Sequence, residues 1–154
     1  MREGFGGVIG ERNRGGKKVI VQKERWEGIP LLHVYNKEMK KDAPIVVFLH
    51  GFMSAKEHNL HYAYNLVEKG VRVILPDAYM HGERSENLPE SRMNLIFWRI
   101  VIKYVGEVEI LHKVLKEKGF HGKIGVMGTS MGGITTTGCL KKYDWIKAAG
   151  VLMG

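Results

Sequence analysis

The chain has 154 residues, of which 44% are hydrophobic and 26% are charged, and its formal net charge is +8 at pH 7. This length suits one domain with a hydrophobic core and is too short for two ordinary domains. The single cysteine, Cys139, excludes a disulfide scaffold, and no apolar segment reaches membrane-spanning length. We therefore expect a soluble cytoplasmic protein.

Basic side chains are spread along the whole sequence. An excess of positive charge is typical of proteins that bind nucleic acid or anionic membranes. Here no basic cluster is interleaved with aromatic residues, as it would be on a surface that binds single-stranded nucleic acid. We therefore interpret Lys and Arg as solvated surface residues and expect neither nucleic acid nor a membrane as partner.

The predicted elements alternate between strands and helices. Residues 1–16 are rich in glycine and charge, and we expect a flexible or weakly ordered lead-in there. Apolar and β-branched residues predict paired strands at residues 17–24 and 30–35, with Glu27 and Gly28 in the turn. The pattern predicts four further strands and three helices, in chain order: strand 45–49, helix 56–69, strand 71–75, helix 91–118, strand 123–127, helix 134–142 and strand 147–153. Gly106 lies inside the second helix, where we expect a bend.

Alternation of this kind indicates an α/β fold with right-handed crossovers between parallel strands. The continuous apolar run at residues 45–49 suits a strand that is covered on both faces, as in a parallel sheet. We predict a three-layer sandwich with a mostly parallel sheet, formed by residues 17–154.

One motif indicates a nucleophile. Gly128-Thr129-Ser130-Met131-Gly132 fits G-x-S-x-G, follows a predicted strand directly and opens a predicted helix. A reactive hydroxyl has to stand clear of the sheet on a sharp turn, and the two glycines prevent side chains from colliding across that turn. Ser130 would lie at a helix N-terminus, which favours developing negative charge.

A second motif, His50-Gly51-Phe52, follows the apolar strand at residues 45–49. Acyl transfer needs two N–H donors that are aimed at the oxyanion. The backbone N–H of Met131 would supply one donor, and the N–H of Phe52 the other. Gly51 permits the loop to turn, and we expect the His50 side chain to shape the loop rather than to act as a base.

With these residues the sequence resembles the α/β-hydrolase superfamily. Three segments carry the resemblance, at residues 46–52 (VVFLHGF), 73–85 (VILPDAYMHGERS) and 124–133 (IGVMGTSMGG). It is most similar to the small esterase branch that includes prolyl-oligopeptidase-like and dienelactone-hydrolase-like enzymes.

The resemblance implies a hydrolase of ester or peptide bonds with Ser130 as nucleophile and the main chains of Phe52 and Met131 as oxyanion donors. It also implies that Asp77 and His81 lie in a loop that borders and shapes the site. The substrate would be a small-molecule ester or peptide, and the mechanism needs no organic cofactor and no metal.

The sequence departs from the family pattern after the nucleophile. In this superfamily the triad acid and then the histidine follow the serine along the chain. After Ser130 the chain offers one carboxylate, Asp144, and no histidine. We therefore expect a partial α/β-hydrolase fold that ends after about the sixth strand, the N-terminal portion of a longer hydrolase.

Other interpretations stay open. A base could be recruited from His50, His81, His58 or His61. His58 and His61 lie three residues apart on a predicted helix, but a metal site there would need a third ligand. The chain could instead be a non-catalytic α/β module that binds a protein partner or an anionic ligand. The last strand, at residues 147–153, would form an open sheet edge and favour self-association.

Overall fold

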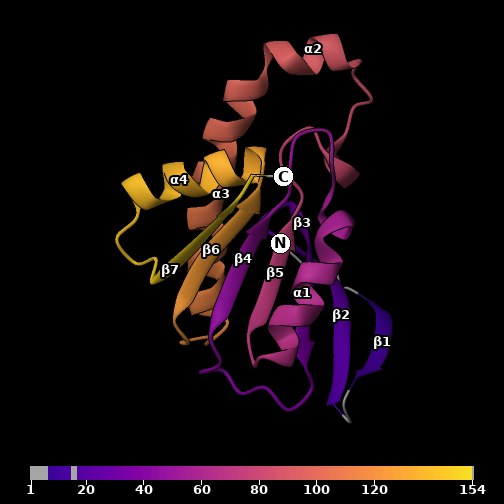
Figure 1. Ribbon diagram of the computed structural model, residues 1–154, viewed down its shortest axis with the longest axis vertical. Coiled ribbons are helices and arrows are strands. Elements are labelled where there is room, and N and C mark those ends of the chain that lie inside the picture. The colour runs from indigo at the N-terminus through magenta and orange to yellow at the C-terminus, as the bar shows by residue number, and fades with distance from the viewer. Residues whose placement is uncertain (1–6, 15–16, 154) are drawn as a thin grey trace.

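Among the residues that the computed structural model describes, 7–14 and 17–153, seven strands form one sheet in the order β1-β2-β3-β5-β4-β6-β7 (Figure 1). Strands β4 to β7 are parallel, whereas β1, β2 and β3 form an antiparallel meander that joins them through β5. The bounds are β1 (Val8–Arg14), β2 (Lys17–Trp26), β3 (Ile29–Asn36), β4 (Ile45–Leu49), β5 (Arg72–Pro76), β6 (Ile124–Thr129) and β7 (Ala148–Leu152).

Helices cover both faces of the sheet. The core on one face joins α1 (Leu60–Glu68) to the strands, and the core on the other face joins α3 (Phe97–Glu117) and α4 (Met131–Lys142) to them. Strand β4 contributes Val47 and Leu49 to the second core and Phe48 to the first, because successive side chains of a strand point to opposite faces. The three-layer α/β sandwich with a mostly parallel sheet is therefore confirmed.

The glycine-rich lead-in contains a strand that the sequence did not predict. Strand β1 pairs with β2 through the backbone, while Val8 and Ile9 remain 55% and 56% exposed. Backbone pairing needs no buried side chains, so a strand can form at residues 8–14 without a hydrophobic pattern that would have predicted it. Residues 1–6 and 15–16, which belong to the same expected lead-in, lie outside the described residues.

The long helix expected at residues 91–118 is two helices, α2 (Glu90–Leu95) and α3. They are separated at Ile96, which has φ −107° and ψ 10°. The bend expected at Gly106 was wrong, because this residue lies in the uninterrupted part of α3. The break directs Met93 into the core and sets the Phe97 ring against Phe52, at 5.2 Å between ring centroids.

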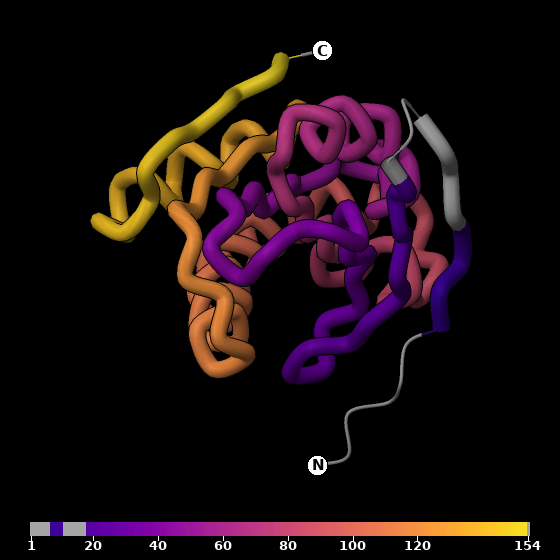
Figure 2. Tube along the Cα trace, turned by 90° about the horizontal axis from the view of Figure 1, so that it is seen from below, coloured from indigo at the N-terminus to yellow at the C-terminus, as the bar shows by residue number. Residues whose placement is uncertain are grey.

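The helix expected at residues 56–69 begins with a 3₁₀ turn, η1 (Lys56–Asn59), before α1, and a second short turn, η2 (Gly82–Arg84), follows β5. Strand β7 pairs with β6, and its outer edge has no partner strand among the described residues. Figure 2 shows this last strand running along the outside of the domain. No helix within the described ranges has both the length and the apolar character needed to cross a membrane.

Candidate active site

Ser130 lies on a strained turn between β6 and α4. Its backbone has φ 50° and ψ −114°, a conformation that non-glycine residues rarely adopt. Its N–H donates to the carbonyl of Leu152 in β7 at 2.8 Å, and the residue itself is exposed. The side chain therefore stands clear of the sheet on a turn that the surrounding strands hold in place.

The glycines of the motif are required by space. A Cβ on Gly128 would lie 2.2 Å from the carbonyl carbon of Gly132, and a Cβ on Gly132 would lie 2.1 Å from the carbonyl oxygen of Leu49. Atoms of the main chain cannot move away as a flexible side chain can. Only glycine at both positions lets β6, the turn and the end of β4 approach each other this closely.

The loop after β4 lies directly beside this turn. In the parallel register Leu49 pairs with Gly128, so both strands end at the same level. A Cβ on Gly51 would lie 3.5 Å from the Cβ of Ser130 and 3.4 Å from the carbonyl oxygen of Thr129. The structure thus brings together the two segments that the sequence singled out.

Both expected N–H donors belong to this junction. The Phe52 N–H has no hydrogen-bond acceptor among the described residues. Met131 is the first residue of α4, and the first N–H groups of a helix lack partners within it. The half-buried Phe52 ring packs against His81 and Phe97, with centroids 5.7 and 5.2 Å away. The main-chain N–H groups of Phe52 and Met131 are therefore available to a ligand.

His50 is fully buried and uses both ring nitrogens. Its Nδ1–H donates to the carbonyl of Gly51 at 2.8 Å, and its Nε2 accepts from the N–H of Ala78 at 3.0 Å. Burial lowers the pKa of His50 to about 4, against the smaller opposing effect of the bond to Gly51. The imidazole is therefore neutral at pH 7, with no free lone pair to take a proton from Ser130.

His81 is engaged in the same way. Its Nε2 accepts from the N–H of Met53 at 3.0 Å, and its Nδ1–H donates to the carbonyl of Tyr79 at 2.9 Å. Burial lowers the pKa of His81, although the bond to Tyr79 opposes the shift. This histidine connects the loop after β4 to the loop after β5 and has no nitrogen left to act as a base.

The remaining candidates for acid and base make no hydrogen bond to Ser130 within the part of the chain that the structure describes. His58 is exposed on η1, where its Nδ1 lies 2.8 Å from the Oγ of Ser54, and His61 is exposed on α1 beside Tyr62. Asp144 is exposed after the end of α4. Within the described residues the Ser130 hydroxyl makes no hydrogen bond, and no three His, Cys, Asp or Glu side chains are grouped as a metal site would require.

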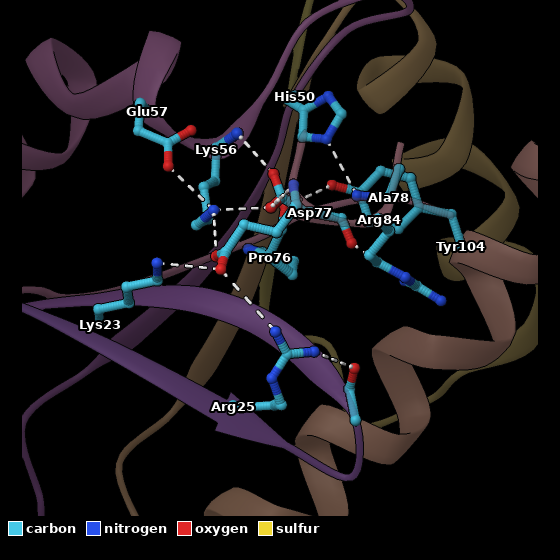
Figure 3. Close-up of polar contacts among 12 residues, drawn as sticks. Lys23, Arg25, His50, Lys56, Glu57, Pro76, Asp77, Ala78, Arg84 and Tyr104 are labelled. Atoms are coloured by element: carbon cyan, nitrogen blue, oxygen red, sulfur yellow. Dashed lines mark hydrogen bonds and ion pairs between the residues drawn. The ribbon is translucent and has the colours of Figure 1, made fainter. Parts of the chain in front are cut away.

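Asp77 follows β5 and is the centre of a buried polar cluster (Figure 3). Its Oδ1 accepts from the N–H of Lys56 at 3.0 Å, and its Oδ2 accepts from the Nζ of Lys56 at 2.6 Å and from the N–H of Glu83 at 3.1 Å. Gly82 adopts φ +54°, and a Cβ there would lie 2.1 Å from Asp77 Oδ1. The carboxylate is thus bound to both the η1 and η2 turns.

Lys56 is the residue of this region that the sequence did not indicate. It lies four positions after Phe52 and was included in a predicted helix as an ordinary surface lysine. Its side chain has no exposed surface. Two of the carboxylates that neutralise its charge, those of Asp77 and Glu83, come from far along the chain. No local pattern reveals such a pairing.

Comparison with known proteins shows the family of this chain. The model of the family described as serine aminopeptidase, S33 (Hydrolase_4) matches residues 40–154. The chain belongs to this family, within the α/β-hydrolase superfamily. The matched region contains the loop after β4, the Asp77 loop and the Ser130 turn.

Two curated relatives are named as esterases. The Bacillus subtilis (strain 168) protein named "Putative esterase YitV" is 48% identical over 139 residues, which are 88% of this chain and 54% of that protein. Esterase YjfP of Escherichia coli (strain K12) is 31% identical over 140 residues, 88% of this chain and 55% of that protein. The chain therefore spans about half the length of the curated relatives it matches.

Solved structures share the fold. A cold-adapted esterase from an Arctic intertidal metagenomic library aligns with a TM-score of 0.72 at 19% identity, over 96% of this chain and 66% of that one. Est1E from Butyrivibrio proteoclasticus, solved with ferulic acid bound, aligns with a TM-score of 0.62 at 24% identity, over 80% of this chain and 48% of that one. The partial α/β-hydrolase fold expected from the sequence is confirmed.

Proposed function

We propose that this chain carries the nucleophile and the oxyanion hole of a serine hydrolase that cleaves carboxylic esters. The observation that carries the proposal is the exposed Ser130 on its strained turn, with the loop of Gly51 beside it. Relatives named as esterases, at 48% and 31% identity, support an ester rather than a peptide bond as the substrate.

In this mechanism the Oγ of Ser130 attacks the ester carbonyl carbon while a base takes its proton. The carbonyl oxygen becomes an oxyanion and accepts hydrogen bonds from the N–H groups of Phe52 and Met131, whose contribution is largest in the transition state. The alcohol leaves with the proton that the base returns, and water then attacks the acyl-enzyme by the same route. His50, Gly51, Gly128, Gly132, Asp77 and His81 hold this geometry and do not react.

We further propose that the base and its carboxylate come from outside these 154 residues. Two observations support this: the matched regions make up only 54% and 55% of the curated relatives, and His50 and His81 have both ring nitrogens engaged. The chain would then be the N-terminal portion of a complete hydrolase.

Labelling with a fluorophosphonate, together with p-nitrophenyl acetate turnover, tests the nucleophile in the complete gene product that contains this sequence. We expect Ser130→Ala to abolish labelling and to lower kcat at least about 10³-fold. Ser91→Ala, on the exposed surface of α2, is the matched control and should behave as wild type. Unchanged turnover in Ser130→Ala would remove Ser130 from the mechanism.

A second candidate is the binding of an anionic ligand. A cavity of about 640 Å³ has Phe120, Ile124 and Trp145 in its lining, together with Lys116, Lys123 and Lys147. An anion with a flat apolar part would suit this lining. Binding of an anilinonaphthalene sulfonate should weaken when salt is added and in the variant Lys123→Glu. The control variant Lys113→Glu changes a lysine outside the cavity and should bind as wild type does. Equal affinities of the two variants would exclude a site here.

A further inference from the structure

We propose that Lys56 is a positioning residue for the oxyanion hole. In this proposal its buried ammonium fastens the loop at residues 50–56 to the end of β5, so that the N–H of Phe52 stays directed toward Ser130. The proposal rests on the proposed function and adds to it a residue outside both sequence motifs.

Lys56 makes two hydrogen bonds to the carboxylate of Asp77. Its main-chain N–H donates to Oδ1 at 3.0 Å, while its Nζ donates to Oδ2 at 2.6 Å. One carboxylate therefore fixes both the backbone and the side chain of the same residue. Asp77 is itself immobilised, since it is fully buried and also accepts the N–H of Glu83.

The ammonium is surrounded by carboxylates (Figure 3). Besides Asp77, the Nζ of Lys56 lies 2.8 Å from Glu83 Oε2 and 2.9 Å from Glu57 Oε1. From β2, Lys23 Nζ and Arg25 Nη2 reach Glu83 Oε1 at 3.0 and 3.8 Å. Three cations thus balance three carboxylates, and the network joins η1, η2, β2 and the end of β5.

Stability alone does not account for this lysine. Removing an ammonium from water costs several kcal/mol, and buried ion pairs can often be replaced by apolar residues without loss of stability. Burial lowers the pKa of Lys56, but the hydrogen bonds to Asp77, Glu83 and Glu57 outweigh burial and raise it. What the charged pair supplies is a fixed orientation, because its hydrogen bonds are directional and an apolar contact is not.

The loop that is fastened in this way contains the proposed donor. His50 accepts from the N–H of Ala78, the N–H of Met53 donates to His81, and Lys56 binds Asp77, so three contacts attach the loop to residues 77–81. Phe52 lies between the first two contacts. Lys56 is the charged contact among the three and the last one before α1.

Small displacements matter at an oxyanion hole. The donors act when they lie about 2.7–3.1 Å from the developing oxyanion, and losing one donor costs about 10²–10³ in kcat. Loosening the loop should therefore affect the transition state more than the binding of a neutral ester. This difference separates positioning from a general loss of structure.

The closing experiment compares steady-state kinetics of p-nitrophenyl acetate hydrolysis in the complete gene product. We expect Lys56→Met and Asp77→Asn each to lower kcat about 10–100-fold and to change KM less than about 3-fold. Lys69→Met, an exposed lysine at the end of α1, is the matched control and should keep the wild-type kcat. Ser130→Ala is measured alongside.

The outcomes are distinguishable. If Ser130→Ala keeps its turnover, the proposed function fails, and the role of Lys56 fails with it. If Ser130→Ala is inactive while Lys56→Met and Asp77→Asn keep kcat within about 2-fold, the role of Lys56 alone is overturned.

A readout that is independent of turnover covers a variant that folds poorly. Hydrogen exchange of peptides that span residues 50–56 should be about 10-fold faster in Asp77→Asn than in Lys69→Met, with α3 unchanged. Equal protection of residues 50–56 in both variants would overturn the proposal even if Lys56→Met cannot be purified.

Discussion

Ser130 occupies a conformation that costs about 1–3 kcal/mol, which the rest of the structure has to offset. The offset comes from close main-chain packing: the Ser130 N–H is bound to Leu152, and Gly128 and Gly132 let β4, β6 and α4 meet without side chains between them. The strain is thus offset by this main-chain hydrogen bond and by the close packing of the segments around the serine.

Gly128→Ala should disrupt this arrangement. The new Cβ would lie 2.2 Å from main-chain atoms of Gly132, so a strand or a helix has to shift, at a cost of roughly 2–4 kcal/mol. Urea unfolding measures the loss. Gly106→Ala is the matched control, because its Cβ would meet nothing within 4 Å and should stabilise α3 by about 0.5–1 kcal/mol. Equal stabilities of the two variants would contradict the close packing.

His50 should make the folded state sensitive to acid. Burial lowers the pKa of His50 from 6.5 to about 4, so the unfolded chain binds a proton between these values and the folded protein does not. The free energy of unfolding is therefore fully retained above pH 6.5 and falls by roughly 3 kcal/mol as the pH drops to 4.

His50→Gln, which does not titrate, isolates this effect. The variant should be less stable than wild type at pH 7 and should show a shallower loss between pH 6.5 and 4 in urea titrations. His121→Gln, the same substitution at an exposed position, is the matched control variant. Parallel slopes for wild type and His50→Gln would show that His50 is not buried in its neutral form.

At the scale of elements, periodicity and turn residues were sufficient for most of the sheet. Strands β2 to β7, the turn at Glu27 and Gly28, and the elbow between β6 and α4 follow from local patterns, because apolar and β-branched runs indicate the strands and glycines mark the turns. Strand β1 was missed because backbone pairing leaves no hydrophobic pattern. The break at Ile96 was missed because the apolar residues keep their helical spacing across it, from Met93 to Phe97.

Some residues of the site can likewise be recognised from local sequence patterns, and others cannot. Ser130 and the His50-Gly51-Phe52 loop are recognisable because their chemistry depends on adjacent residues. Lys56 is not recognisable in this way. The carboxylate nearest to its ammonium in space belongs to Asp77, which is 21 positions away along the chain and meets Lys56 only when β4 and β5 align. Long-range charge pairing is therefore the part of the site that sequence reasoning could not reach.

The connection between α4 and β7 is fastened to α3 by aromatic residues. Trp145 stacks on His112 with centroids 3.9 Å apart and donates to Glu109 Oε2 at 2.8 Å, while the Tyr143 hydroxyl donates to the carbonyl of Val105 at 2.8 Å. These contacts fix the start of β7, the strand whose Leu152 carbonyl binds the N–H of Ser130.

Trp145→Leu should therefore lower the free energy of unfolding by about 1–3 kcal/mol, since it removes a stacked ring and a hydrogen bond to a carboxylate. Trp98→Leu is the matched control, because Trp98 is 64% exposed and should change stability by less than about 0.5 kcal/mol. Chemical unfolding followed by circular dichroism compares the two variants, and a larger loss for Trp98→Leu would refute this account of the connection.

For the molecule as a whole, the edge strand matters most. Strand β7 supplies the carbonyl that holds Ser130, yet its outer edge has no partner among the described residues, and Val151 is 44% exposed on it. An apolar, unpaired edge of this kind favours pairing with another chain. The net charge of +8 opposes such pairing, so added salt should promote it.

We therefore expect the 154-residue polypeptide to associate at micromolar concentration, more strongly at 0.5 M than at 0.05 M salt. Sedimentation velocity over a concentration series measures this association. Val151→Lys should shift the population toward monomer, because charged side chains on an edge strand prevent further pairing. Leu140→Lys adds the same charge on α4 instead of on β7 and replaces a side chain that is 48% exposed, so it should change association less. An equal shift in both variants would mean that net charge, and not the edge of β7, controls self-association.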